Sequence, residues 1–208
     1  MLLTSHRART LAKLSLAFAE VAGRHPRLCQ TDPVGRGGGG VDLPGHDPPY
    51  RAAAGLLDRP RMPLAPPADL LAAERAATAT LAALLARSRD GVGVRFEVAI
   101  AEAAGELAMP LRHGLTGAGG SLDGAHPLYA VYAAAEGHVA LAALEPRFGA
   151  RLAGLLDVQD AAADPARLRG ALEAAFRARA AEAWEDWALS NDVPLAAVRA
   201  SGRGDPAR

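Results

Sequence analysis

The chain has 208 residues, half of them hydrophobic, and its 23 basic side chains balance its 23 acidic ones. This length and apolar content suit a folded protein with one or two cores, while zero net charge and 4% aromatic residues argue against nucleic-acid and anionic-membrane partners. With a single cysteine, Cys29, and no apolar run of membrane-spanning length, we expect a soluble, cytoplasmic protein.

The first half of the chain alternates helical and strand-like patterns. Residues 10–24 carry apolar side chains at helical spacing and predict one amphipathic helix. A short strand at residues 27–31 leads into a glycine-rich loop at residues 35–40, which lacks the Lys-Ser/Thr ending of a phosphate-binding P-loop. A short helix, a long helix and a strand are predicted next, at residues 48–57, 70–87 and 94–100.

The second half begins with a helix at residues 101–113 and a second glycine-rich loop at residues 114–120. Two β-like runs, residues 128–132 and 138–144, flank Glu136-Gly137 and predict a hairpin. Three helices and a last strand are predicted at residues 147–156, 165–179, 181–190 and 193–198.

This alternation of helices and strands predicts an α/β fold with two lobes. The glycine-rich segment that begins at residue 114 marks the division between them. We expect the lobes to comprise residues 1–113 and 114–200, followed by a frayed tail at residues 201–208.

Three acidic residues stand at the predicted starts of helices. Asp47 and Glu145 are each followed by proline, and Asp69 is followed by the long helix. Such acids can be helix caps, because Asp is a preferred N-cap and Pro a preferred first residue. They can also form a site, because helix N-termini stabilise negative charge. Capping is the simpler interpretation for Asp47 and Asp69, whereas Glu145 ends a buried strand, where α/β proteins keep their sites.

The sequence offers little support for a metal site or a catalytic serine. Its six histidines and one cysteine show no paired metal-ligand spacing. Ser121 lies in a Gly-Gly-Ser-Leu-Asp run without the closing glycine of a nucleophile elbow. We therefore expect no metal.

Seven short motifs occur in a fixed order. They are His-Pro-Arg-Leu (25–28), Gly-His-Asp (45–47), Ala-Asp (68–69), Leu-Leu-Ala-Arg-x-Arg-x-Gly-x-Gly (84–93), Ala-x-x-x-Tyr-x-x-Tyr (125–132), Ala-Leu-Glu-Pro-x-Phe (143–148) and Asp-Val-Pro-x-x-x-Val (192–198). Together they resemble the family III CoA-transferases, a group that also contains carnitine CoA-transferase and α-methylacyl-CoA racemase. The resemblance implies a Rossmann-like large lobe and a small α/β lobe in an interlocked homodimer that binds acyl-CoA.

The chain departs from the family pattern at three places. The family normally has a nucleotide-fold segment ahead of the matched region and a C-terminal return to the large lobe, and we expect this chain to lack both. The glycines that usually follow Ala-Asp are replaced by Leu70-Leu-Ala-Ala. We therefore expect a partial large lobe, completed in a homodimer or by a partner chain.

The resemblance also implies roles for four residues. In family transferases the aspartate that matches Asp69 attacks a CoA thioester, forms a mixed anhydride and then carries CoA to an acceptor carboxylic acid. In the racemase, the residues that match His46 and Asp69 are bases on opposite faces of the α-carbon, and the match of Glu145 hydrogen-bonds the imidazole. Asp47, the last residue of Gly-His-Asp, is the fourth candidate catalytic residue.

We expect CoA transfer between a CoA thioester and a carboxylic acid. The acyl-CoA is then a substrate rather than a resident cofactor, and no residue is assigned to binding it. Racemase-type 1,1-proton transfer is the first alternative. A truncated, non-catalytic or partner-dependent half-module is the second.

Overall fold

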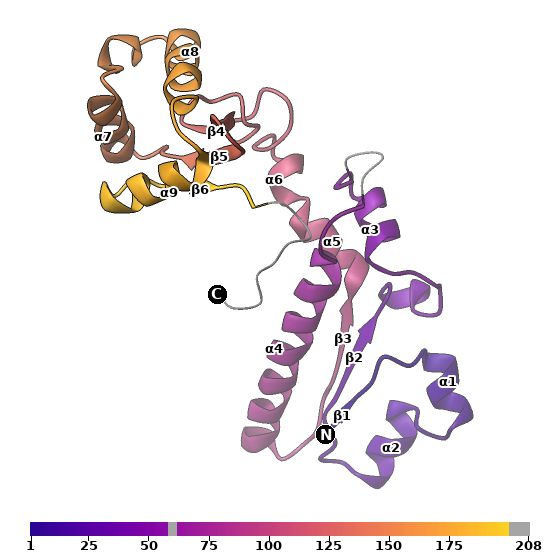
Figure 1. The fold of residues 1–208 in the computed structure, drawn as a ribbon. Helices are drawn as coiled ribbons and strands as arrows, with labels where there is room; N and C mark the ends of the chain where they lie inside the picture. The colour runs from indigo at the N-terminus through magenta and orange to yellow at the C-terminus, as the bar shows by residue number, and fades with distance from the viewer. Residues whose placement is uncertain (58–61, 200–208) are drawn as a thin grey trace. The chain divides into compact units, whose positions relative to one another are not determined.

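The computed structural model describes residues 1–57 and 62–199, and the chain forms two compact units, Met1–Met109 and Pro110–Arg208 (Figure 1). The tail expected at residues 201–208 lies outside the described part. The division into functional lobes at residue 113 stays a prediction. Within the described ranges, the structure contains no helix with the length and apolarity needed to cross a membrane.

The first unit contains a parallel sheet with the strand order β1-β2-β3. The strands are β1 (Leu2–Leu3), β2 (Gln30–Val34) and β3 (Arg95–Ala99). Its helical segments are α1 (Ala8–Lys13), α2 (Phe18–Arg24), η1 (Gly38–Gly40), α3 (Asp47–Ala53), α4 (Pro67–Asp90) and α5 (Ile100–Leu107). Because the strands are parallel, their carboxyl ends meet at one edge of the sheet, where α/β proteins bind ligands.

The long helix α4 packs against the sheet and against α5, and its buried face consists of small side chains. Alanines recur every four residues on its buried face, at Ala68, Ala72 and Ala76. Farther along, the Thr80 hydroxyl donates a hydrogen bond to the Thr31 hydroxyl of β2, at 3.0 Å. Pro67 starts the helix and Gly91, in the left-handed conformation, ends it. The predicted long helix is therefore confirmed and extends three residues farther at each end.

The single helix predicted at residues 10–24 is wrong, because the chain forms α1 and α2 with a break between them. Ser15 adopts a left-handed conformation, and the Leu16 N–H donates to the Leu11 carbonyl oxygen at 2.8 Å. This bond closes α1 with a Schellman motif. The Arg24 guanidinium donates to the Ser15 carbonyl oxygen, at 3.1 Å, and stabilises the turn.

Strand β2 begins three residues later than the predicted strand at 27–31 and includes Asp32 and Pro33, which have low strand propensity. The strand tolerates the buried Asp32 because its carboxylate is satisfied. It accepts hydrogen bonds from the Gln30 amide at 2.7 Å and from the Arg95 guanidinium at 2.5 Å.

The second unit contains an antiparallel sheet with the order β4-β5-β6. The strands are β4 (Tyr129–Ala133), β5 (His138–Ala142) and β6 (Leu195–Ala197). The predicted hairpin is confirmed by the pairing of β4 with β5, and Gly137 supplies the positive φ of its turn. Helical segments of this unit are α7 (Pro146–Leu156), η2 (Gln159–Ala161), α8 (Pro165–Phe176) and α9 (Ala181–Ser190), and α6 (Met109–Arg112) precedes the sheet.

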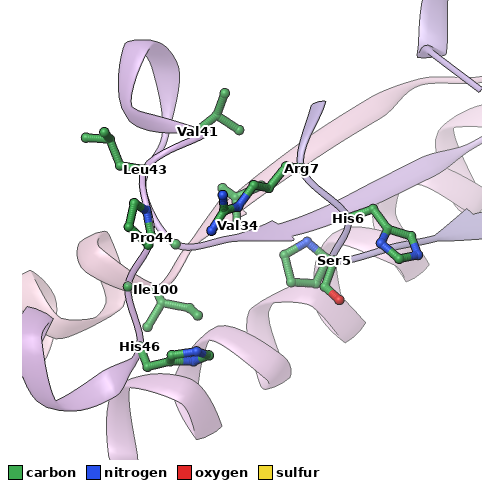
Figure 2. A pocket seen from close by; sticks show the side chains of 12 residues that line it. Ser5, His6, Arg7, Val34, Val41, Leu43, Pro44, His46 and Ile100 are labelled. Carbon is green, nitrogen blue, oxygen red and sulfur yellow. The ribbon is translucent and has the colours of Figure 1, made fainter. Parts of the chain in front are cut away.

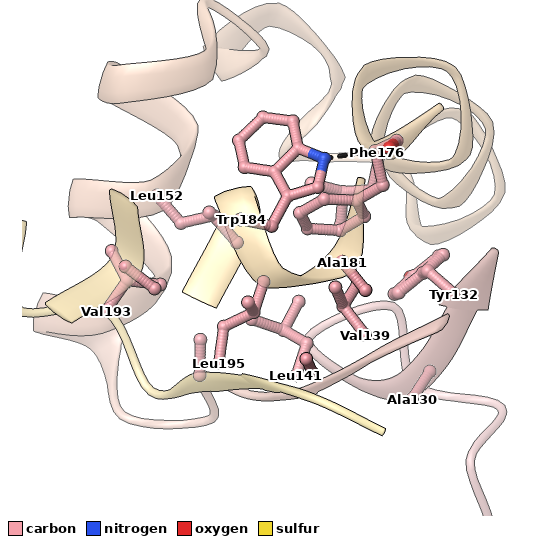
Figure 3. Close-up of a cluster of buried hydrophobic side chains, with 14 of the residues drawn as sticks. Ala130, Tyr132, Val139, Leu141, Leu152, Phe176, Ala181, Trp184, Val193 and Leu195 are labelled. Atoms are coloured by element: carbon pink, nitrogen blue, oxygen red, sulfur yellow. Dashed lines mark hydrogen bonds between the residues drawn. The ribbon is translucent and has the colours of Figure 1, made fainter. Parts of the chain in front are cut away.

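The core of the second unit lies between one face of this sheet and the helices (Figure 3). The Phe176 ring contacts the rings of Tyr132 and Trp184, with centroids 5.2 and 5.3 Å apart, in a tilted and an edge-to-face arrangement. The buried Trp184 indole donates its N–H to the Phe176 carbonyl oxygen at 2.8 Å. This core buries its large aromatic surface without leaving the indole N–H unpaired.

We expect Gly93→Ala to destabilise the first unit. The Gly93 N–H donates to the Pro26 carbonyl oxygen at 2.7 Å, and a Cβ at Gly93 would overlap the Leu28 carbonyl oxygen. The free energy of unfolding should fall by about 1–3 kcal/mol, as expected for overpacking. Urea unfolding followed by far-ultraviolet circular dichroism measures this change. In the control Gly23→Ala, a Cβ meets no atom within 4 Å inside α2, and stability should rise by about 0.5–1 kcal/mol. An unchanged stability in Gly93→Ala would contradict the described packing.

Candidate functional site

A cleft of about 320 Å³ lies at the carboxyl ends of the parallel strands (Figure 2). Its walls come from the loop after β1, the end of β2, the segment before α3 and the start of α5. The polar groups in its lining include Arg7 and His46, and its apolar floor includes Val34 and Ile100. Such a cleft, which combines the Arg7 guanidinium with apolar side chains, suits an organic ligand that carries negative charge.

Asp47 joins the N-termini of α3 and α4. It is the first residue of α3, yet its side chain does not cap that helix. Its Oδ2 accepts a hydrogen bond from the Ala68 N–H, at 2.7 Å, and its side chain is only 1% exposed. Ala68 is the second residue of α4, so its N–H has no partner within the helix. Asp47 therefore caps a helix, as predicted, but the helix that it caps is α4 and not α3, which it begins.

Asp69 lies in the first turn of α4, directly after the capped Ala68. Its carboxylate does not cap α4, so the capping interpretation is wrong for this residue. Burial of the carboxyl raises the pKa of Asp69 above its ordinary value of 3.8, and the negative charge of Asp47 raises it further. The His46 imidazole and the backbone N–H of Asp47 oppose this shift without cancelling it. The fold thus brings His46, Asp47 and Asp69 together.

His46 connects this carboxylate pair with the cleft. It precedes the first residue of α3 in an extended conformation, and its exposed ring lines the cleft. Because the same residue influences the pKa of Asp69, the cleft and the carboxylates form one candidate site. Histidine is the side chain best suited to exchange protons near neutral pH.

Glu145 lies in the second unit, at the position that precedes α7. It is exposed, and its backbone carbonyl oxygen accepts the N–H groups of Phe148 and Gly149. The predicted place at a helix start is therefore confirmed. Its predicted hydrogen bond to the His46 imidazole stays a prediction.

Arg51 is a charged residue of the site that the motifs did not identify. Its side chain is 12% exposed, and its Nη1 lies 3.6 Å from Asp47 Oδ1. Its Nη2 donates to the Leu56 carbonyl oxygen at 3.1 Å. The signal in the sequence is the spacing of four residues between Asp47 and Arg51, which places both side chains on one helix face.

Metal-ligating side chains do not gather anywhere in residues 1–57 or 62–199. No group of three or more His, Cys, Asp and Glu side chains in these ranges has the geometry to hold a metal ion.

Comparison with known proteins finds a family and solved structures that match nearly the full length of the chain. A sequence profile described as CoA-transferase family III matches residues 1–203. The fold is similar to that of the hypothetical protein Rv3272 from Mycobacterium tuberculosis, at 24% identity and a TM-score of 0.79, over 96% of this chain and 60% of that one. A CAIB/BAIF family protein from Brucella suis is similar at 18% identity and a TM-score of 0.72, over 95% and 60%. A search of curated proteins found no match.

These relatives are longer than the chain, which spans about 60% of the length of each solved structure. At identities below 25%, the likeness to the solved structures concerns the fold. It confirms the predicted α/β fold, which the structure builds from one parallel and one antiparallel sheet.

We expect Asp69→Asn to stabilise the protein at neutral pH. Since the pKa of Asp69 is higher in the folded protein than its ordinary value of 3.8, ionisation of the carboxyl opposes folding. The resulting loss of folding stability is absent well below pH 3.8 and develops as the pH rises through the pKa of Asp69 in the folded protein. Thermal unfolding should therefore give Asp69→Asn a higher Tm than the parent at pH 7 and an equal Tm near pH 3.

Asp123→Asn is the control of opposite sign. The N–H groups of Ala125 and Gly119 lower the pKa of Asp123, so its ionised form stabilises the fold. That stability is present above pH 3.8 and is lost as the pH falls through the lower folded pKa. Asp123→Asn should therefore lower the Tm at pH 7. An Asp69→Asn variant that is no more stable than the parent at pH 7 would contradict the described environment of Asp69.

Proposed function

Because the chain belongs to CoA-transferase family III, we propose that it transfers CoA between a CoA thioester and a carboxylic acid, with Asp69 as the nucleophile. The observation that carries this proposal is the environment of Asp69. Its Oδ1 is shielded from solvent and has no hydrogen-bond partner within the described residues. A carboxylate is a weak nucleophile in water, and removal of its hydration makes it more reactive.

In the proposed reaction, Asp69 attacks the carbonyl carbon of the donor thioester, and the CoA thiolate leaves. The product is a mixed anhydride between Asp69 and the donor acyl group. The thiolate then attacks the aspartyl carbonyl carbon, which releases the donor acid and leaves CoA on Asp69 as a thioester. An acceptor carboxylate repeats the two steps in reverse order, so that acyl-CoA is formed and the free Asp69 carboxylate is regenerated.

The cleft at the ends of the parallel strands is the place that we propose for part of the acyl-CoA. Its lining combines the Arg7 guanidinium with apolar side chains, which matches a ligand with phosphates and an acyl chain. His46 lies at the border between this cleft and Asp69. No residue outside the first unit is needed for this part of the proposal.

A second copy or a partner chain is also part of the proposal. Helix α4 exposes three leucines, Leu70, Leu81 and Leu85. Exposed apolar side chains on one helix favour burial against another protein surface.

Racemase-type proton transfer is the second candidate function. The observation that favours it is the hydrogen bond from the Ala68 N–H to the Asp47 carboxylate, which brings together the chain neighbours of these residues, His46 and Asp69. Two bases near one cleft can remove a proton from one face of an α-carbon and return it to the other.

The transferase proposal predicts a covalent label on Asp69. The protein should be incubated with an acyl-CoA, trapped with hydroxylamine, and digested for mass spectrometry. Asp69→Ala should reduce labelling and turnover by on the order of 10³-fold or more. Asp90→Ala, at the far end of the same helix, is the matched control and should retain both. Labelling of another residue, or full turnover in Asp69→Ala, would exclude Asp69 as the nucleophile.

Solvent deuterium separates the two reactions, because racemisation breaks the α-C–H bond and CoA transfer does not. A racemase should introduce deuterium at the α-carbon of a 2-methylacyl-CoA in heavy water. His46→Ala should then slow this exchange by about 10²- to 10⁴-fold. A transferase should leave the α-carbon unlabelled and convert an added carboxylic acid into its CoA ester. If a folded sample catalyses neither reaction with several acyl-CoAs, the half-module alternative remains.

A further inference from the structure

The ion pair between Arg51 and Asp47 lies below the surface of the first unit. Both groups belong to α3, four residues apart, and their side chains are 12% and 1% exposed. Arg51 is held from its other side by the Leu56 carbonyl oxygen. A carboxylate as buried as that of Asp47 needs a nearby cation, since removal of one partner from a buried pair leaves an uncompensated charge.

The two oxygens of Asp47 face different partners. Oδ1 lies toward the Arg51 guanidinium at 3.6 Å, and Oδ2 accepts the Ala68 N–H at 2.7 Å. Ala68 is itself fully buried, and Asp69 is the next residue. A connected set of contacts therefore runs from Arg51 through Asp47 to the turn that carries Asp69.

We propose that Arg51 is a positioning residue of this site: it holds the Asp47 carboxylate in place, and Asp47 in turn fixes the first turn of α4, which carries Asp69. This inference rests on the proposed role of Asp69 for its consequence in catalysis. Its structural part, the dependence of the Ala68 hydrogen bond on Arg51, is measurable without any activity.

Among the described residues, the acidic side chains of the helix that packs on α3 and α4 are engaged elsewhere. Helix α5 packs against both helices, and its acidic side chains are Glu102 and Glu106. Glu106 pairs with Arg75 at the surface, and Glu102 lies near Gly37. On the side of α3, His46 adds its imidazole next to Asp69. In the part of the chain that the structure describes, Arg51 is the cation that pairs with Asp47, so its removal should act on that carboxylate directly.

The consequence for catalysis follows from geometry. Reacting groups must be held close to their productive positions, and a displacement of about 1 Å can cost on the order of 100-fold in rate. Without Arg51, the Asp47 carboxylate should turn toward solvent and release the Ala68 N–H. The Asp69 carboxylate would then lose its fixed direction, although no group in contact with the substrate has been removed.

Hydrogen exchange of the Ala68 amide, measured by NMR, tests the structural part. Arg51→Leu should speed this exchange by about tenfold or more, as expected for the loss of a charge-assisted hydrogen bond. Asp47→Ala should have the same effect, and adding Arg51→Leu to Asp47→Ala should change nothing further. Arg51→Lys should restore most of the protection, and Arg51→Gln replaces Arg51→Leu if the latter fails to fold. Arg75→Leu, which removes a surface pair of α4, is the matched control and should leave Ala68 unchanged.

Labelling of Asp69 by an acyl-CoA, measured on the same variants, tests the catalytic part. The rate should fall in Arg51→Leu and recover in Arg51→Lys. Unchanged Ala68 exchange in Arg51→Leu, or fully additive effects in the double variant, would overturn the proposal. Lost protection with an unchanged labelling rate would also overturn it. Absence of labelling in the parent protein would instead reject Asp69 as the nucleophile, while the exchange data would still decide the link between Arg51 and Ala68.

Discussion

The hydrogen bond from the Ala68 N–H to the Asp47 carboxylate holds the candidate site together. It joins the first turns of α3 and α4, which are 20 residues apart in the chain, counting from Asp47 to Pro67. The bond satisfies an N–H group that α4 cannot satisfy itself, and it brings a second carboxylate next to Asp69. Burial and this neighbouring charge then raise the pKa of Asp69. The same hydrogen bond therefore caps α4 and places the charge that raises the pKa of Asp69.

Helix α4 provides the rigid support for this arrangement. Its alanine-lined face allows close packing on the parallel sheet, and the sheet in turn sets the place of the cleft at its carboxyl edge. His46 lies between cleft and carboxylates because α3 begins directly after it. The site is thus built where the ends of strands meet the starts of helices, a position that suits the binding of negatively charged groups.

The sequence predicted the elements whose signals are local. Proline and acidic residues at their starts correctly indicated α3 and α4, and the Glu136-Gly137 turn correctly indicated the hairpin. The break between α1 and α2 was missed because it depends on Ser15 in a left-handed conformation, which glycine would have signalled and serine does not. The buried Asp32 in β2 was missed because its partner Arg95 lies 63 residues away.

The same distinction applies to the site. The motif pattern identified His46, Asp47 and Asp69, and the fold brings them together. The motif pattern could not reveal that Asp47 caps the neighbouring helix, because that contact depends on tertiary structure.

NMR titration of the Asp69 carboxyl carbon tests this description of the site most directly. We expect a midpoint above 3.8 in the parent protein and a lower midpoint in Asp47→Ala, where the neighbouring charge is removed. A midpoint at or below 3.8 in the parent, or one that Asp47→Ala does not lower, would contradict it.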